Sequence, residues 1–137
     1  MLLLPIMSTH HTVVWLDHSE ARIFNLDAET IKHIDSKSPT AQSHVHNKSS
    51  VSGRRGEHDL EHYYRDIVQA LAESAEVLVV GPSTAKLELV RYAHKHHADL
   101  EKRITGLETV DHPTDGQLVA YAKKYFIAAG SDAVNAQ

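Results

Sequence analysis

The sequence contains no cysteine, no apolar run long enough to cross a membrane and no excess of positive charge. Without cysteine, neither a disulfide framework nor a thiolate metal site can form, which fits a reducing compartment. The apolar residues 1–7 are too few for a transmembrane helix and lack the basic segment and small-residue cleavage site of a signal peptide. The net charge of −4 gives no global attraction to nucleic acid. We therefore expect a cytoplasmic protein with no membrane partner.

The length and composition are those of one globular domain. A chain of 137 residues is large enough to bury a single core, and 42% hydrophobic with 23% charged residues is ordinary for such a chain. We assign the domain to residues 12–127 and expect flexible tails at 1–11 and 128–137. Met7 is an alternative start to Met1. The sequence gives no support for or against a homo-oligomer.

A short run without charge, Val77–Gly81, predicts a buried central strand that Gly81-Pro82 ends. Ser83 or Thr84 is placed to accept a hydrogen bond from a free backbone N–H and cap a following helix. The apolar positions of that helix are expected at Leu87, Val90 and Ala93/His94. A strand followed at once by a capped helix is the repeating unit of an α/β layer.

The remaining elements follow from apolar patterns and turn residues. Strands are expected at 12–16, 21–26, 30–34 and 103–110, and helices at 57–74 and from a capping box at Thr114–Gln117 onward. Between the third strand and the first helix, residues 35–56 have almost nothing to bury, and such long loops tend to be functional or disordered. The order predicts an α/β fold, a single domain whose mixed sheet of about five strands has three flanking helices.

This element order resembles the middle domain of the eukaryotic and archaeal class-1 peptide-chain release factors and of Pelota, over roughly residues 12–127. Val14–Phe24 looks like the first hairpin of that family, and Val79–Lys86 is similar to its strand, glycine, small residues and lysine before a helix. Gly53–His58 stands where release factors carry Gly-Arg-Gly-Gly-Gln-Ser. The resemblance implies a ribonuclease H-like topology and a free-standing protein of the translation machinery.

The sequence departs from the release factors at their Gly-Gly-Gln tripeptide, which in that family places backbone and water beside the peptidyl-tRNA ester. Arg55 replaces one glycine and removes its freedom at positive φ. Glu57 replaces the glutamine and puts an anion where a neutral amide would meet the tRNA. We therefore expect no peptidyl-tRNA hydrolysis, no enzyme activity and no cofactor. Because Pelota also lacks the tripeptide, its loss does not argue against ribosome or RNA binding.

Basic residues gather between Lys32 and Arg55, where five lysines and arginines stand against Asp35 alone. Cations in a flexible loop neutralise phosphates and follow an irregular RNA surface. Since no aromatic residue is interleaved, sequence-specific base stacking is not expected. We predict a non-catalytic protein that associates with the ribosome or structured RNA through this loop. The alternative is that the loop is disordered and has no binding role. The predicted RNA-binding residues are Lys48, Gly53, Arg54, Arg55, Gly56, Glu57 and His58.

The twelve histidines raise a hypothesis of another class. His58, Glu61 and His62 fit the H-x-x-E-H pattern, because positions four apart on a helix place both imidazoles on one side. They predict a metal-dependent hydrolase or a metal-binding protein, against the alternative of an exposed helix face of mixed charge. The run His94–His97 offers metal ligands, RNA phosphate contacts or a solvated helix end.

Asp17 and Lys86 are each interpreted as structural rather than catalytic or nucleotide-binding residues. A ribonuclease H-like nuclease needs three or four carboxylates around two metal ions, and only Asp17 and Glu61 are placed to begin such a set. Asp17 is better explained as a turn residue of the first hairpin. The turn 81–84 lacks the glycine spacing and the lysine position of a P-loop, so a plain turn with Lys86 on the surface is expected.

Overall fold

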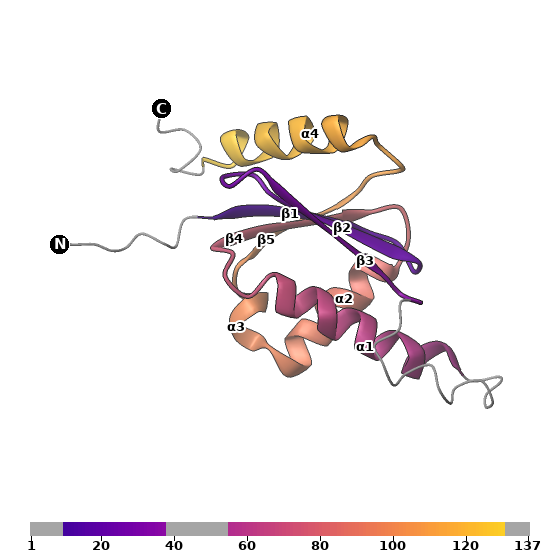
Figure 1. Ribbon diagram of the computed structural model, residues 1–137. Coiled ribbons are helices and arrows are strands. Elements are labelled where there is room, and N and C mark those ends of the chain that lie inside the picture. Colours follow the sequence, from indigo (N-terminus) through magenta and orange to yellow (C-terminus); the bar gives the residue numbers. More distant parts are fainter. Residues whose placement is uncertain (1–9, 38–54, 131–137) are drawn as a thin grey trace.

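The computed structural model describes residues 10–37 and 55–130, and of residues 55–59 it describes the backbone alone. No helix in this part of the chain is long and apolar enough to span a membrane. The elements shown in Figure 1 are β1 (His11–Leu16), β2 (Glu20–Asn25), β3 (Thr30–Asp35), α1 (Arg55–Ala70), β4 (Glu76–Gly81), α2 (Ala85–His96), α3 (Ala98–Glu101), β5 (Ile104–Thr109) and α4 (Asp115–Ala128).

The five strands form one mixed sheet in the order β3-β2-β1-β4-β5. β2 is antiparallel to both β1 and β3, whereas β4 is parallel to both β1 and β5. It follows that β1, β3, β4 and β5 all run in one direction and end at the same edge of the sheet. We call this edge, formed by residues 17–19, 36–37, 82–84 and 110–114, the carboxyl edge.

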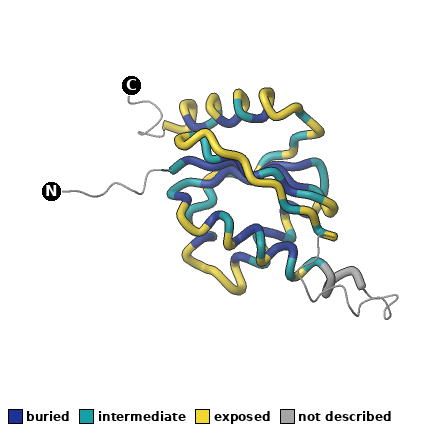
Figure 2. Tube along the Cα trace, viewed as in Figure 1, coloured by how far each residue is buried: buried dark blue, intermediate teal, exposed yellow. Residues whose placement is uncertain are grey.

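The sheet separates two hydrophobic cores, because helices cover both of its faces (Figure 1). One core lies between the sheet and α1, α2 and α3, and the other lies between the sheet and α4. Alternate residues of the central strand β1 serve the two cores, so that Val14 faces the first and Trp15 the second. Every residue of β1 is therefore buried, and Figure 2 shows the middle of the sheet as the most deeply buried part of the fold.

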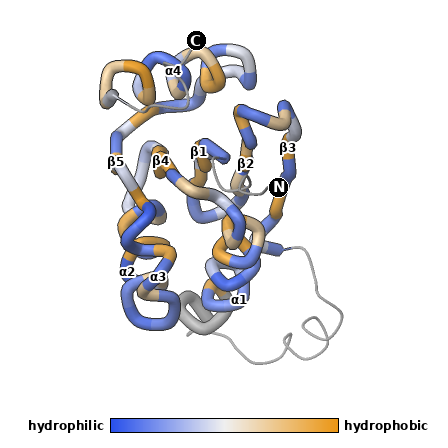
Figure 3. Tube along the Cα trace, turned by 90° about the vertical axis from the view of Figure 1, so that its left-hand side faces the viewer, coloured by the Kyte–Doolittle hydropathy of each residue, from blue (hydrophilic) through white to orange (hydrophobic). Residues whose placement is uncertain are grey.

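The predicted α/β fold with a five-stranded mixed sheet is confirmed, and four helices rather than three flank the sheet. The unpredicted helix α3 is a single turn of four residues, too short to produce a helical period in the sequence. Figure 3 shows α1 on the β2–β3 side below the sheet and α2 with α3 on the β4–β5 side, while α4 lies above.

Helix α1 begins at Arg55 and ends at Ala70, whereas the sequence predicted residues 57–74. The two ends of the loop predicted at 35–56 thus belong to β3 and α1. The apolar stripe predicted for α1 is confirmed, since Tyr63, Ile67 and Leu71 are fully buried against the sheet.

The stripe predicted for α2 is wrong at Leu87 and right at Ala93, while Val90 is half-buried. Leu87 is 43% exposed, and the buried side of the helix consists of Ala85, Lys86, Leu89 and Ala93. Two alanines on this side let the helix approach the sheet closely, which sets its rotation. The hydroxyl of Thr84, the N-cap residue, makes no capping bond, and the Ser83 hydroxyl accepts from the Ala85 N–H at 3.3 Å instead.

The capping box predicted at the start of α4 is present. The Thr114 hydroxyl accepts from the Gln117 N–H at 3.1 Å, and the Gln117 side chain accepts from the Thr114 N–H at 2.9 Å. At the other end of the helix, the Tyr125 hydroxyl donates to the Thr105 carbonyl at 2.9 Å. Helix α4 is therefore attached to the sheet at β5 as well as through its buried side chains.

Candidate functional site at the carboxyl edge

The segment predicted to bind RNA joins the fold at the carboxyl edge. β3 ends at Asp35, two residues before the last described residue Lys37, and α1 begins at Arg55 and runs from this edge back beneath the sheet (Figure 1). Among the predicted binding residues, Lys48, Gly53 and Arg54 lie outside the described residues. Arg55, Gly56, Glu57 and His58 form the first turn of α1, where the helical backbone alone is described.

Two consecutive tyrosines hold α1 two turns after its start. The Tyr63 hydroxyl donates to the Asp17 carbonyl at 2.8 Å, which ties the helix to the β1–β2 turn. The Tyr64 hydroxyl donates to Glu88 Oε1 at 2.6 Å, which ties it to α2. His18 Nε2 lies 3.3 Å from the other Glu88 oxygen. The helix that carries Arg55 is thus fixed against the β1–β2 turn and α2, and His18 links these two elements to each other.

The pKa shifts of Tyr63, Tyr64 and Glu88 favour the hydrogen bonds that these side chains make. Burial raises the pKa of Tyr63, and the charge of Asp17 adds to the effect. Burial also raises the pKa of Tyr64, together with its bond to Glu88. Burial alone would raise the pKa of Glu88, but hydrogen bonds from Tyr64 and His18 outweigh it and hold the pKa below its ordinary value. Both hydroxyls therefore remain donors while Glu88 remains an anion.

The lowered pKa of Glu88 gives a stability term that depends on pH. Its contribution is fully present above the ordinary pKa of about 4.3 and is lost as the pH falls through the lower pKa of the folded state. Because the side chain is 37% exposed, we expect Glu88→Gln to cost no more than about 1 kcal/mol at neutral pH. Urea unfolding at pH 7 and at pH 3 should show this difference shrinking in acid. The exposed Glu61→Gln is the matched control, and a difference that does not change with pH would contradict the assignment.

A second set of contacts fastens the β5–α4 loop to the sheet. Trp15 Nε1–H donates to the Asp111 carbonyl at 2.7 Å. Arg22 lies over the Trp15 ring, 4.6 Å from its centroid, and donates to Asp115 Oδ1 at 2.6 Å and to the Pro113 carbonyl at 3.1 Å. Sequence reasoning missed this cluster. Its one signal was Arg22, a charged residue inside an otherwise apolar strand.

The carboxylates of the edge have local partners. Asp17 Oδ1 accepts from the Ser19 N–H at 2.8 Å and the Glu20 N–H at 3.0 Å, which confirms its interpretation as a turn residue. His33 Nε2 lies 3.1 Å from Glu20 Oε1, and His112 lies 3.8 Å from Asp17 Oδ2. Asp17 thus has a structural role in the hairpin turn, and Glu20 lies beside a histidine of β3.

Among the side chains that the structure describes, those of residues 10–37 and 60–130, no three from His, Asp or Glu are grouped so that they could hold a metal ion. The predicted trio is only partly described, since Glu61 is exposed, His62 is half-buried and the His58 side chain is not described. In the other histidine run, His94 Nδ1 lies 3.0 Å from Glu101 Oε1, and the His97 N–H donates to the Ala93 carbonyl. Those contacts fit the interpretation of a solvated helix end.

Lys86 is buried, which corrects the prediction that it lies on the surface. It is 8% exposed, and its ammonium donates to the Ser83 carbonyl at 2.9 Å. As the second residue of α2 it stands between the buried Ala85 and Leu89. Its aliphatic stem therefore packs on the core side of the helix while the ammonium reaches back to the turn.

Comparison with solved structures identifies the fold. Pelota from Thermoplasma acidophilum superposes with a TM-score of 0.53 and 21% identity, over 93% of this chain and 35% of Pelota. Pelota from Archaeoglobus fulgidus gives 0.52 and 10%, over 86% of this chain and 31% of that one. An archaeal translation termination factor gives 0.52 and 16%, over 89% and 42%. The chain spans about a third to two-fifths of these proteins, with which it shares the fold of one part.

No family model and no curated protein matches the sequence significantly.

Proposed function

We propose that this chain, which has the fold of part of Pelota and of an archaeal translation termination factor, is a non-catalytic protein of the translation machinery. In this proposal it is cytoplasmic and associates with the ribosome or with structured RNA. The observation that carries the proposal is the likeness of fold, which extends over 93% and 89% of the chain in those two comparisons.

The carboxyl edge supports a binding role for the basic segment. The described chain before and after the basic segment lies at this edge, at the end of β3 on one side and at the start of α1 on the other. Because Tyr63 and Tyr64 fix α1, the position of Arg55 is set by the body of the protein. A charged segment held at two fixed points loses less entropy on binding than a free tail does.

The start of α1 also supports binding rather than hydrolysis. Arg55 and Gly56 belong to a regular helix, so their backbone has the right-handed conformation rather than an open glycine turn. Glu57, in the same turn, supplies a carboxylate in place of an amide. These features favour contact with phosphates by neighbouring cations over the placement of a water at an ester.

Co-sedimentation with ribosomes across a salt series tests the proposal. We expect pelleting at low salt that fades as salt rises, because cations on the protein displace counterions from phosphates. Arg54→Ala/Arg55→Ala is expected to weaken binding and to lower the slope of log K against log salt by about 1–2, which corresponds to two lost phosphate contacts. The matched control is Lys123→Ala/Lys124→Ala, which removes two exposed cations from α4 on the opposite side of the sheet.

Each outcome decides a separate point. If the parent protein does not pellet at low salt, ribosome association is wrong and the likeness is one of fold alone. If the α4 control loses binding as much as the arginine variant, the basic segment is not the contact. His62→Gln is expected to leave pelleting unchanged, and a loss there would move attention to the histidine face of α1.

A further inference from the structure

The two outer strands of the sheet differ in how their free edges are protected. The register between β4 and β5 shifts at Thr105, which forms a bulge in β5. The Tyr125 hydroxyl donates to the carbonyl of this same residue at 2.9 Å. Both devices hinder the addition of another strand at an edge. The β5 edge is therefore protected against strand pairing.

The edge of β3 lies at the other end of the sheet and has neither device (Figure 3). All six of its residues pair with β2 in unbroken register, and none of them is proline. The Ser36 N–H donates to the Ser19 carbonyl at 2.8 Å. Because hydrogen-bonded pairs alternate along an antiparallel ladder, residues 31, 33 and 35 direct their N–H and C=O groups away from β2. Within the described chain, no strand pairs with these groups.

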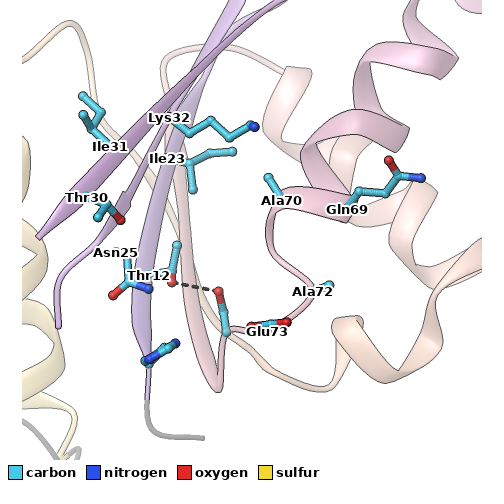
Figure 4. Close-up of a pocket in the computed structure, with 12 residues that line it drawn as sticks. Thr12, Ile23, Asn25, Thr30, Ile31, Lys32, Gln69, Ala70, Ala72 and Glu73 are labelled. Carbon is cyan, nitrogen blue, oxygen red and sulfur yellow. Dashed lines mark hydrogen bonds between the residues drawn. The ribbon is translucent and has the colours of Figure 1, made fainter. Parts of the chain in front are cut away.

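Side chains alternate between the two faces of the sheet along β3. Figure 4, a close-up of the cleft between β3 and the end of α1, shows Lys32 pointing toward the helix and Ile31 pointing away from it. By the same alternation Ile34 lies on the α1 face, where it packs against the core, whereas His33 and Asp35 lie on the opposite face. The strand thus has an isoleucine at the core on one face and a basic and an acidic residue on the other.

The face away from α1 carries two cross-strand pairs of opposite charge type. Arg22 and His33 stand directly opposite each other, and Glu20 and Asp35 form the next pair along the two strands. His33 Nε2 lies 3.1 Å from Glu20 Oε1, on the diagonal between the pairs. Asp35 Oδ1 accepts from the Lys37 N–H at 2.9 Å, and within the described chain the carboxylate has no ion-pair partner. Since like charges directly opposite on a sheet are destabilising, a basic residue on the free side of Asp35 would offset the repulsion from Glu20.

A second copy of this chain supplies such a residue in one antiparallel register. A two-fold axis through Ile34 sets His33 opposite the partner's Asp35, and Asp35 opposite the partner's His33. Residues 33 and 35 both have outward backbone groups, so these pairs also exchange N–H···O=C bonds. Across the four strands the order of side chains becomes Arg22, His33, the partner's Asp35 and the partner's Glu20. Two basic residues are then followed by two acidic ones.

The neighbouring registers bring like groups together. An axis through Lys32 sets two ammonium groups opposite each other, which is destabilising. An axis through His33 opposes two imidazoles and leaves Asp35 opposite the partner's Ile31. Only the axis through Ile34, among these three, places an isoleucine against its own copy, where further burial of apolar surface is favourable. Charge and apolar contact therefore favour the same register.

We propose that two copies of this chain associate through β3, in antiparallel register about Ile34, and join their two five-stranded sheets into one. His33 donates to the partner's Asp35 on one face, and the two Ile34 side chains meet on the other. A neutral imidazole also donates to a carboxylate, so the contact does not require a protonated histidine. A single strand pair is a narrow interface, and we expect a reversible dimer at micromolar concentrations. The inference does not depend on ribosome association.

Single cysteines test the register directly, since the chain has no cysteine of its own. Opposed Cα atoms of a non-hydrogen-bonded antiparallel pair are about 4.5 Å apart, a separation that a disulfide spans. Under mild oxidation we expect Ile34→Cys to form an intermolecular disulfide at least about tenfold faster than Lys32→Cys or His33→Cys. Non-reducing gel electrophoresis of the full chain measures the rates. Fastest cross-linking at position 32 or 33 would overturn the register, and equal rates at all three positions would overturn the pairing.

Charge exchange tests the contact between His33 and Asp35 in sedimentation equilibrium of the full chain. Asp35→Lys and His33→Glu are each expected to weaken the dimer at least about tenfold, because each sets like charges opposite each other. The double variant His33→Glu/Asp35→Lys restores opposite charges and is expected to regain the dimer. It lacks the Asp35 bond to the Lys37 N–H just as Asp35→Lys does, so recovery cannot come from that turn.

Asp99→Lys is the matched control, because it makes the same charge change at an exposed residue of α3 and should leave the dimer intact. Far-ultraviolet circular dichroism verifies that each variant is folded. The proposal is overturned if the parent remains monomeric up to about 1 mM. It is equally overturned if the single charge variants dimerise like the parent, if the folded double variant stays as weak as they are, or if the control loses the dimer as they do.

Discussion

Replacing Trp15 with alanine is expected to lower the free energy of unfolding by about 3–5 kcal/mol, the range for a large aromatic lost from a core. The side chain is fully buried in the core beneath α4. The variant also loses the hydrogen bond to the Asp111 carbonyl and the surface over which Arg22 lies. Domains are commonly stable by only about 5–15 kcal/mol, so this change would remove a large part of the total.

Urea unfolding followed by far-ultraviolet circular dichroism is the measurement, because Trp15 is the one tryptophan and its fluorescence disappears with it. Trp15→Phe separates the two causes. It keeps most of the buried surface and leaves the Asp111 carbonyl without its donor, so we expect an intermediate loss of about 1–3 kcal/mol. A Trp15→Ala protein within about 1 kcal/mol of the parent would contradict this account of the α4 core.

Replacing Gly81 with alanine is expected to cost about 3 kcal/mol, at the upper end for an overpacked core. A Cβ at this position would lie 2.1 Å from the Leu16 carbonyl oxygen and 3.3 Å from its carbon. Both atoms are backbone, and Leu16 and Gly81 end the two central strands β1 and β4. The clash is therefore relieved only if the strands separate where they are most deeply packed.

Gly106→Ala is the matched control, because its Cβ meets the end of a side chain rather than backbone. That Cβ would lie 2.1 Å from the Tyr125 hydroxyl, and the ring can rotate away at the cost of its bond to the Thr105 carbonyl. We expect a loss of about 1 kcal/mol, the value of one hydrogen bond. Chemical denaturation of both variants checks the difference, and equal losses at the two glycines would show that strand separation is not the cause.

The sequence predicted the order of the strands and most helices because their signals are local. The uncharged run of β4, the stripe Tyr63–Leu71 of α1 and the capping box of α4 each lie within a few residues of one another. The rotation of α2 could not be read in this way. Leu87 and Leu89 are both candidates for the buried side of that helix. The structure buries Leu89 together with the small Ala85 and Ala93, and the sequence alone does not show this packing.

Contacts of the site itself depend on residues far apart in the chain. Trp15 meets Asp111 across 96 positions and Arg22 meets Asp115 across 93, and no single-sequence pattern reports such pairs. The predicted binding residues are a different case. Their charge was evident from composition, but the structure describes no side chain among them, so the assignment to RNA stays a prediction.

The central place of β1 in the sheet has a consequence for the order in which the protein is made. The meander β1–β2–β3 leaves the ribosome first, yet β1 acquires its parallel partner only when residues 76–81 have followed. Parallel pairing across so long a separation is slow compared with hairpin formation. Until β4 and the four helices arrive, β1, whose six residues are all buried in the folded protein, has a free side and two uncovered faces, and such intermediates are prone to aggregate.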